Sequence, residues 1–212
     1  RLMDVKTFLC VRRDFKGKLH LPINASTCSF MFVDINVSEI DLTEFDTTNI
    51  VDMDYMFLEA DLGDCFSLGS PTNAQANTPD RNILTLNTEG VTSMSGMFKD
   101  CKVKHLDLNS LRTHNVTDFS DMFCSCNDLI DLNVDGFDTS NAEDFHGMFQ
   151  GCIKLTQLNV KHFNVDNVLH MSCLFSKCLR LKVIDLESWN FSQVRDANEM
   201  FAYCEKLEKI IA

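Results

Sequence analysis

Apolar residues recur along most of the chain at a nearly fixed interval. In six Met-Phe or Leu-Phe pairs along the chain, a Cys or an Ala follows three positions after the Phe. These paired positions are Phe57 and Ala60, Phe98 and Cys101, Phe123 and Cys126, Phe149 and Cys152, Phe175 and Cys178, and Phe201 and Cys204. The first interval is the longest, and the later Phe positions follow one another at nearly equal steps. A period in the twenties is typical of a solenoid, in which each unit buries its apolar side only against its neighbours.

Each unit predicts the same order of local elements. In Leu132-Asn133-Val134 the alternation places the two apolar side chains inward and Asn133 outward, as in a short strand. A turn follows at residues 137–141, and we expect the next segment, around Met148-Phe149, to form one helical turn. An Asp such as Asp144 precedes this segment, where a carboxylate accepts the free N–H groups of a helix start.

The repeat divides the chain into two parts. Residues 1–38 do not follow the period well, and we expect an irregular N-terminal cap or a degenerate repeat there. Residues 39–212 then form about six repeats, with an inserted surface loop at about 61–82, where Pro71 and Pro79 lie among Gly, Ser, Asn and Asp residues. Leu207 and Ile210 begin another strand, and no polar capping unit follows them. This pattern favours a fragment of a longer array or an end-to-end self-association.

The segments Asn115–Cys126 and Phe137–Cys152 resemble the BspA-type leucine-rich repeats of bacterial surface proteins and lipoproteins, whose units read F-D-T-S-N-V-T-x-M-x-x-M-F-x-x-C. The resemblance covers roughly residues 39–211, with Leu111 and Trp189 in a Phe position and Ala60 in a Cys position. It implies an α/β repeat fold: a right-handed, leucine-rich-repeat-like solenoid with one short parallel strand and one short helical turn in each repeated unit. It also implies display on a cell surface and adhesion, and it carries no catalytic residue.

The outward positions of the predicted strands are the candidate binding surface, which we call the strand face. Its residues are Asp41, His105, Asp107, Asn109, Asp131, Asn133, Asp135, Asn159, Lys161, Asp185 and Glu187. A continuous face of this kind is a common docking surface in solenoids. The alternative is a solvated face on which Asp and Asn serve solubility and stacking.

The positions of the cysteines favour a structural role over a catalytic or metal-binding role. Cys101, Cys126, Cys152, Cys178 and Cys204 share one phase, and we expect buried free thiols there in preference to disulfides. The off-phase residues Cys10, Cys28, Cys65, Cys124 and Cys173 could pair in an oxidising compartment. Because no C-x-x-C pair and no nucleophile–base motif occurs, we expect no metal site, no cofactor and no enzymatic activity.

Composition narrows the partners. The chain carries 31 acidic and 19 basic residues, a formal net charge of −12, which argues against nucleic acid and favours a basic protein partner. Its apolar runs are too short for direct membrane insertion. The sequence therefore predicts a non-enzymatic, adhesin-like interaction module, on a cell surface or secreted, that binds a host or neighbouring-cell surface protein. Two alternatives stay open, a structural spacer and a cytoplasmic recognition scaffold.

Overall fold

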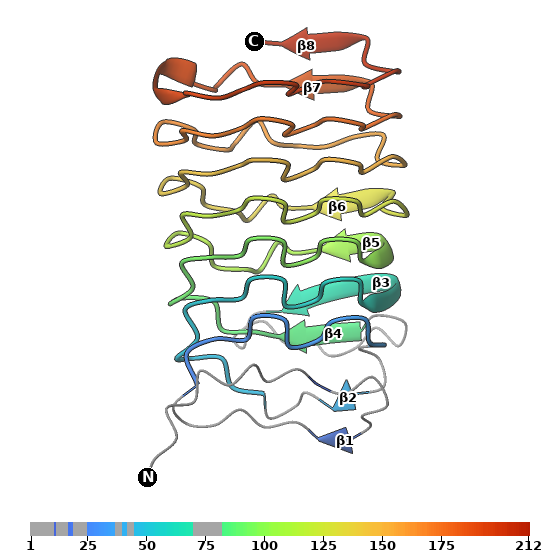
Figure 1. Ribbon diagram of the computed structural model, residues 1–212, viewed down its shortest axis with the longest axis vertical. Helices are drawn as coiled ribbons and strands as arrows, with labels where there is room; N and C mark the ends of the chain where they lie inside the picture. The colour runs from blue at the N-terminus through green and yellow to red at the C-terminus, as the bar shows by residue number, and fades with distance from the viewer. Residues whose placement is uncertain (1–10, 12–16, 19–24, 37–39, 42–44, 70–81) are drawn as a thin grey trace.

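The chain runs in successive passes that lie one above another in a tall stack, with the C-terminus at one end (Figure 1). The computed structural model describes residues 11, 17–18, 25–36, 40–41, 45–69 and 82–212. Each pass is called a coil below. The strands are β1 (Gly17–Lys18), β2 (Ile40–Asp41), β3 (Asp61–Gly69), β4 (Asn82–Thr85), β5 (Lys102–Asp107), β6 (Asp131–Asn133), β7 (Val183–Asp185) and β8 (Lys209–Ile211).

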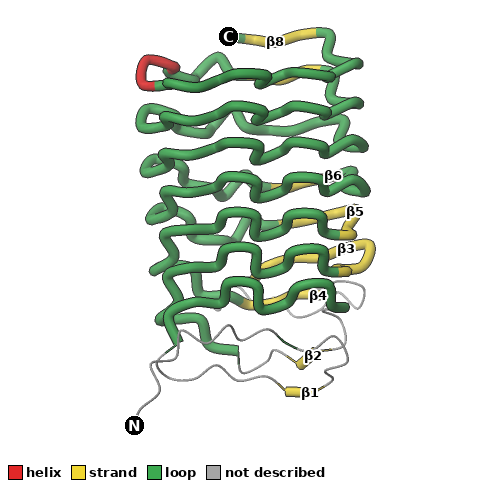
Figure 2. Tube along the Cα trace, in the orientation of Figure 1, coloured by secondary structure: helices red, strands yellow, loops and turns green. Residues whose placement is uncertain are grey.

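The strands pair in parallel along one side of the stack, and loops and turns make up most of the other described residues (Figure 2). They form the sheets β1-β2, β4-β3-β5-β6 and β7-β8. Apolar residues are in register with apolar residues, as where Leu106 of β5 lies beside Leu132 of β6 and both side chains are buried. Successive coils therefore bury the same face of their strands.

The segment around each Met-Phe pair corrects the expected helical turn. Met56 N–H donates to the carbonyl of Met53, three positions back, but the alternate residue Tyr55 donates to Ser95 in the next coil. Tyr55 also has a positive φ of 53°, which an α-helix does not allow. The segment is thus a run of β-turns that shares its N–H groups with the coil above. The same alternation recurs in residues 94–101, 119–126, 145–152 and 171–178. In the described part of the chain, the 3₁₀ segment η2 (Phe191–Gln193) is the only helix.

A column of stacked phenylalanine rings fills the core. The rings of Phe57, Phe98, Phe123, Phe149, Phe175 and Phe201 follow one another with centroids 5.3 to 5.8 Å apart and nearly parallel planes. A second series, Phe137, Phe163 and Trp189, stacks beside it, and Trp189 donates its indole N–H to the carbonyl of Val160 at 3.0 Å. Trp189 therefore replaces a Phe without leaving its polar atom unpaired.

The in-phase cysteines are hydrogen-bonded thiols. The thiol of Cys126 donates to the carbonyl of Phe98 in the preceding coil at 3.0 Å, and Cys101, Cys152, Cys178 and Cys204 make the same contact one coil apart. Burial raises the pKa of the Cys126 thiol far above its ordinary value, so it stays protonated. The nine described cysteines are all free, and Cys10 lies outside the described residues.

Buried threonines join the coils at the neighbouring turn. Thr113 donates its hydroxyl to the carbonyl of Asp138 at 2.9 Å and accepts the N–H of the same residue at 2.8 Å. Thr139 bonds Asn164 in the same way one coil later. The Thr of the F-D-T-S-N turn thus satisfies two main-chain groups of the next coil.

Residues 25–36 form a further coil of the stack, which agrees with the degenerate repeat, one of the two alternatives expected for residues 1–38. Phe32 stacks on Phe57 at 5.4 Å, and Thr27 pairs with Asp52 in the same column as the later coils. This coil was not assigned from the sequence because Ile35 occupies the position that holds Cys in the later units. Most of residues 1–24 lie outside the described residues.

The inserted segment at about 61–82 is also corrected in part. Residues 61–69 form β3, a strand between β4 and β5, and Leu62 and Phe66 are buried in the core. The expected surface loop lies outside the described residues for 70–81. The insertion therefore adds a strand to the sheet.

Replacement of Phe149 by alanine is expected to lower the free energy of unfolding by about 3–5 kcal/mol, because its ring is fully buried between Phe123 and Phe175. Urea unfolding followed by circular dichroism measures this loss. The matched control is Phe191→Ala, since Phe191 is 39% exposed. Equal losses in the two variants would show that the ring column does not carry the core.

Candidate docking surface

Parallel pairing brings strand-face residues of successive coils side by side. His105 of β5 is in register with Asp131 of β6, and Asp107 is in register with Asn133. His105 and Asp131 are exposed, whereas Asp107 and Asn133 are half-buried. The face therefore has an outer column and a more embedded column.

The embedded column holds the turn after each strand. The side chains of Asp107, Asn133 and Asp185 each accept the backbone N–H two positions later, at 3.0 to 3.1 Å. The N–H of Glu187 is the largest cause that holds the pKa of Asp185 below its ordinary value, followed by the hydrogen bond from Lys161. These predicted binding residues thus serve the fold as Asx turns.

Other strand-face residues bind each other across coils. Asn159 donates to the carboxylate of Asp135 at 2.8 Å. Lys161 lies 3.1 Å from the carboxylate of Asp185 and 2.7 Å from that of Glu187. Exposed pairs of this kind add little stability, but they fix the direction of the side chains.

His105, Asn109 and Asp131 are the exposed residues of the predicted set outside these turns and bridges. They lie on two neighbouring coils and form the central part of the face. Asp41 lies on β2, in register with Lys18 of β1.

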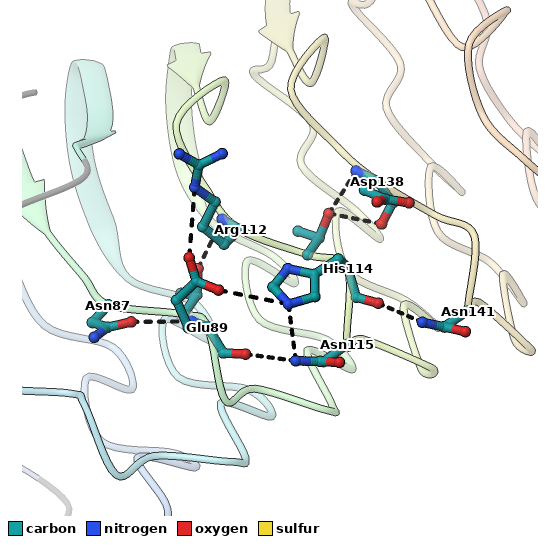
Figure 3. Close-up of polar contacts among 9 residues, drawn as sticks. Asn87, Glu89, Arg112, His114, Asn115, Asp138 and Asn141 are labelled. Atoms are coloured by element: carbon teal, nitrogen blue, oxygen red, sulfur yellow. Dashed lines mark hydrogen bonds and ion pairs between the residues drawn. The ribbon is translucent and has the colours of Figure 1, made fainter. Parts of the chain in front are cut away.

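A polar edge runs beside the strand face at the F-D-T-S-N turns (Figure 3). Asn115 donates its amide to the carbonyl of Glu89 at 2.8 Å, and Asn141 donates to that of His114 at 2.7 Å. The carboxylate of Glu89 also lies 3.8 Å from Arg112 and 3.6 Å from His114. This edge was not predicted from the sequence, although the recurrence of Asn at 115, 141 and 167 was the signal for it.

The Asp residues that precede each Met-Phe segment form another column, on the turn side. Asp118, Asp144 and Asp196 each accept the N–H two positions later, so the expected capping is present at a β-turn instead of a helix. Isolated parallel bridges connect Asp118 to Asp144, Asp144 to His170 and His170 to Asp196.

One contact in this column resembles a nucleophile with its base but lacks that chemistry. Ser172 lies 2.7 Å from His146 Nδ1, and its hydroxyl is also hydrogen-bonded to Asp196, whose pKa it helps to lower after the larger effect of the Asn198 N–H. Because the Ser172 hydroxyl donates to a carboxylate and its side chain is buried, it is not an activated nucleophile.

The family described as "Mycoplasma protein of unknown function, DUF285" matches residues 24–64, 72–133 and 127–212. These ranges cover most of the chain. The chain belongs to the DUF285 family. The first match begins at residue 24, next to the coil that the structure forms over residues 25–36. No curated protein and no solved structure matches this DUF285 chain.

The described part of the DUF285 chain has neither a metal-binding group nor a membrane-spanning helix. It contains no group of three or more His, Cys, Asp or Glu residues placed to hold a metal ion. None of its described helices is long and apolar enough to cross a bilayer.

The turn role of the embedded column predicts unequal effects of alanine substitution on the strand face. Asn133→Ala removes the acceptor for the Asp135 N–H and is expected to cost about 0.5–1.5 kcal/mol of unfolding free energy. Asp131→Ala, on the exposed neighbouring position, is expected to change it by less than about 0.5 kcal/mol. Urea unfolding of both variants checks the difference, and equal costs would contradict the turn role.

The Asp column predicts a pH-dependent gain from Asp144→Asn. Burial is the largest cause that raises the pKa of Asp144, and the charge of Asp118 adds to it. A carboxyl whose pKa is higher in the folded state binds its proton better there, so its contribution to stability falls as pH rises through that folded pKa. The amide keeps the acceptor for the His146 N–H without the charge. The variant is therefore expected to have the higher urea midpoint at neutral pH and no advantage at about pH 3.

Asp196→Asn is the control with the opposite sign. The Asn198 N–H lowers the pKa of Asp196, so the ionised carboxylate stabilises the fold above its unfolded pKa, and this stability is lost as pH falls through the folded pKa. This variant is expected to be less stable than the parent at neutral pH. A shift of the same sign in both variants would contradict the roles assigned to the two carboxylates.

Proposed function

We propose that the chain is a non-enzymatic protein-interaction solenoid of the BspA-type leucine-rich-repeat kind, and that its strand face docks a protein partner. The repeated DUF285 match and the recurrent F-D-T-S-N and Met-Phe motifs support the repeat architecture. The in-register columns of polar side chains on neighbouring coils support the docking role.

The observation that carries the proposal is the fixed spacing of exposed side chains on β5 and β6. His105 and Asp131 are register partners, and the Asx turns of Asp107 and Asn133 hold the backbone directly after them. A face that is ordered before binding loses little conformational entropy when a partner docks. This preorganisation is a property expected of a recognition surface.

The proposed partner is a basic surface on a host or neighbouring-cell protein. The chain has a formal net charge of −12, and Asp131, Asp135 and Glu187 are exposed on the strand face. Such a field attracts a cationic protein and repels nucleic acid and anionic membranes. The proposal places the chain on a cell surface or in secreted form, with the cytoplasm as the alternative, since the nine described cysteines are free thiols.

A structural spacer is the second candidate, and one observation favours it. Strand-face side chains bind one another across coils and thereby stiffen the stack. Asn159 binds Asp135, and Lys161 binds both Asp185 and Glu187. A spacer requires this stiffness and no partner. The two functions differ in whether the exposed residues between these contacts matter.

The double variant Asn109→Lys/Asp131→Lys is expected to weaken capture of a basic surface protein without unfolding the chain. Neither side chain is among those that hold the Asx turns. Parent and variant are immobilised and exposed to extracellular-matrix and cell-surface extracts. Partners identified by mass spectrometry are then titrated at several salt concentrations, where we expect a loss of about tenfold or more in affinity.

The matched control is Glu143→Lys/Gln193→Lys, which changes the net charge equally at exposed positions on the turn side and on η2. A partner lost in the strand-face variant and kept in the control supports docking. A partner lost equally in both would reveal non-specific charge attraction and contradict it. Failure of the folded parent to capture any protein would favour the spacer.

A further inference from the structure

The insertion brings a thiol, an imidazole and a carboxylate into one line on three adjacent strands. Cys65 of β3 is in register with His105 of β5, and His105 is in register with Asp131 of β6. The residues that follow them, Phe66, Leu106 and Leu132, are register partners and are all buried. Because side chains alternate between the two faces of a strand, Cys65, His105 and Asp131 share the opposite, outer face.

The spacing of parallel strands suits a relay between neighbouring side chains. Adjacent strands lie about 4.8 Å apart, so side chains at register positions lie side by side, and a change of rotamer can bring a thiol to an imidazole or an imidazole to a carboxylate. The two outer residues, Cys65 and Asp131, are about 9.6 Å apart by the same spacing. In the described part of the chain, no group of three or more His, Cys, Asp or Glu residues, these three included, is placed to hold a metal ion.

Cys65 differs in its surroundings from the other described cysteines. Six of the nine described thiols are buried: Cys28, Cys101, Cys124, Cys126, Cys152 and Cys178. Cys204 is partly exposed, but its thiol donates to the carbonyl of Phe175. Cys173 is partly exposed as well, and desolvation followed by the nearby carboxylates of Glu199, Asp196 and Asp121 raises the pKa of its thiol.

A cation lies beside Cys65. Lys104 of β5 forms an ion pair with Asp64 at 2.9 Å, and its ammonium also interacts electrostatically with Cys65. The other charged groups on this part of the sheet are Asp61 on β3, Lys102 and Asp107 on β5, and Asp128 and Asp131 on or next to β6. On the other side, β4 comprises residues 82–85, which include no titratable side chain. Partial exposure next to an imidazole and an ammonium is the setting of a reactive cysteine.

We infer that Cys65 is a nucleophilic thiol site that exchanges with accessible disulfides, with His105 as its base and Asp131 as the residue that positions the imidazole. His105 takes the thiol proton, and the Cys65 sulfur attacks one sulfur of the disulfide. A bond forms between Cys65 and that sulfur while the original S–S bond breaks, and the departing thiolate receives the proton from His105. The products are a mixed disulfide on Cys65 and one free thiol, so no external oxidant is needed.

The test measures mixed-disulfide formation at each cysteine of the full chain. Folded protein is treated at neutral pH with a limiting amount of oxidised glutathione, and in a second arm with a folded protein that bears a surface disulfide. Peptide mass mapping follows each cysteine separately over time. We expect Cys65 to react first, with a free thiol released in equal amount, and the two arms distinguish small-molecule from protein disulfides as the source.

Two variants separate base chemistry from simple exposure. His105→Gln is expected to slow the Cys65 reaction by about tenfold or more and to remove one step from its pH–rate profile, because general-base assistance is lost. Asp131→Asn is expected to slow it less and to leave that step in place. The same proteins in urea are expected to react at equal rates, which ties the effect to the folded sheet.

Cys65→Ser and Cys173→Ser form the matched pair of controls, since both cysteines are partly exposed. Only the first is expected to remove the early adduct. Equal rates at Cys65 and Cys173 in the parent would overturn the inference, as would an unchanged Cys65 rate and pH profile in His105→Gln. Circular dichroism shows whether His105→Gln is folded. If it is not, two other results together overturn the inference: an unchanged Cys65 rate in folded Asp131→Asn, and a parent pH–rate profile without the additional step.

Discussion

Each coil completes its main-chain hydrogen bonding in the next coil, and this exchange sets the length of the repeat. In the turn segments, N–H groups alternate between two kinds of partner. Met148 donates to the carbonyl of Phe145 within its own coil, and the following residue, Phe149, donates to the carbonyl of Leu174 in the next coil. A coil that gained or lost one residue here would point its donors at the wrong carbonyls. The Met-Phe positions therefore recur at a nearly constant interval, and the long addition between Phe57 and Phe98 lies between two turn segments.

The same constraint explains which polar residues the repeat can use. Asp144, Thr139 and Asn133 each satisfy a main-chain N–H with a side-chain oxygen, and each occupies a fixed place in its coil. Asn141 adds a donor to a carbonyl of the preceding coil. These short side chains replace the regular helix or long strand that would otherwise pair the backbone. The chain is therefore rich in turns and still keeps its buried polar groups bonded: no described buried side-chain N or O atom lacks a partner.

The part of this architecture that depends only on the period could be predicted from the sequence. The spacing of Phe149 and Cys152 places both in core columns, and the alternation in Leu132-Asn133-Val134 distinguishes the inner from the outer face. Local conformation was harder to predict, because a helical turn and a run of β-turns present the same apolar side chains at short range. The positive φ of Tyr55 and its bond to Ser95 depend on the next coil, which is distant along the chain. The β3 strand was missed for a related reason, since its glycines and polar residues are typical of a loop until a neighbouring strand pairs with them.

The candidate sites also divide into those that follow the period and those that depend on pairing between distant strands. Residues predicted from the period, such as Asp107 and Asp185, are in large part turn-forming residues that recur in several coils. The pairing of Cys65 with His105 has no periodic signal, because the insertion breaks the phase between their strands, and only the register of β3 with β5 brings them together. Cys126, one of the thiols in phase, is buried and bonded to the carbonyl of Phe98, so the fold has already fixed its role. In a repeat protein, positions that break the period are under no such constraint from stacking. A cysteine outside the column, partly exposed and beside an imidazole and an ammonium, is therefore where chemistry can be added without cost to the coil-to-coil bonding.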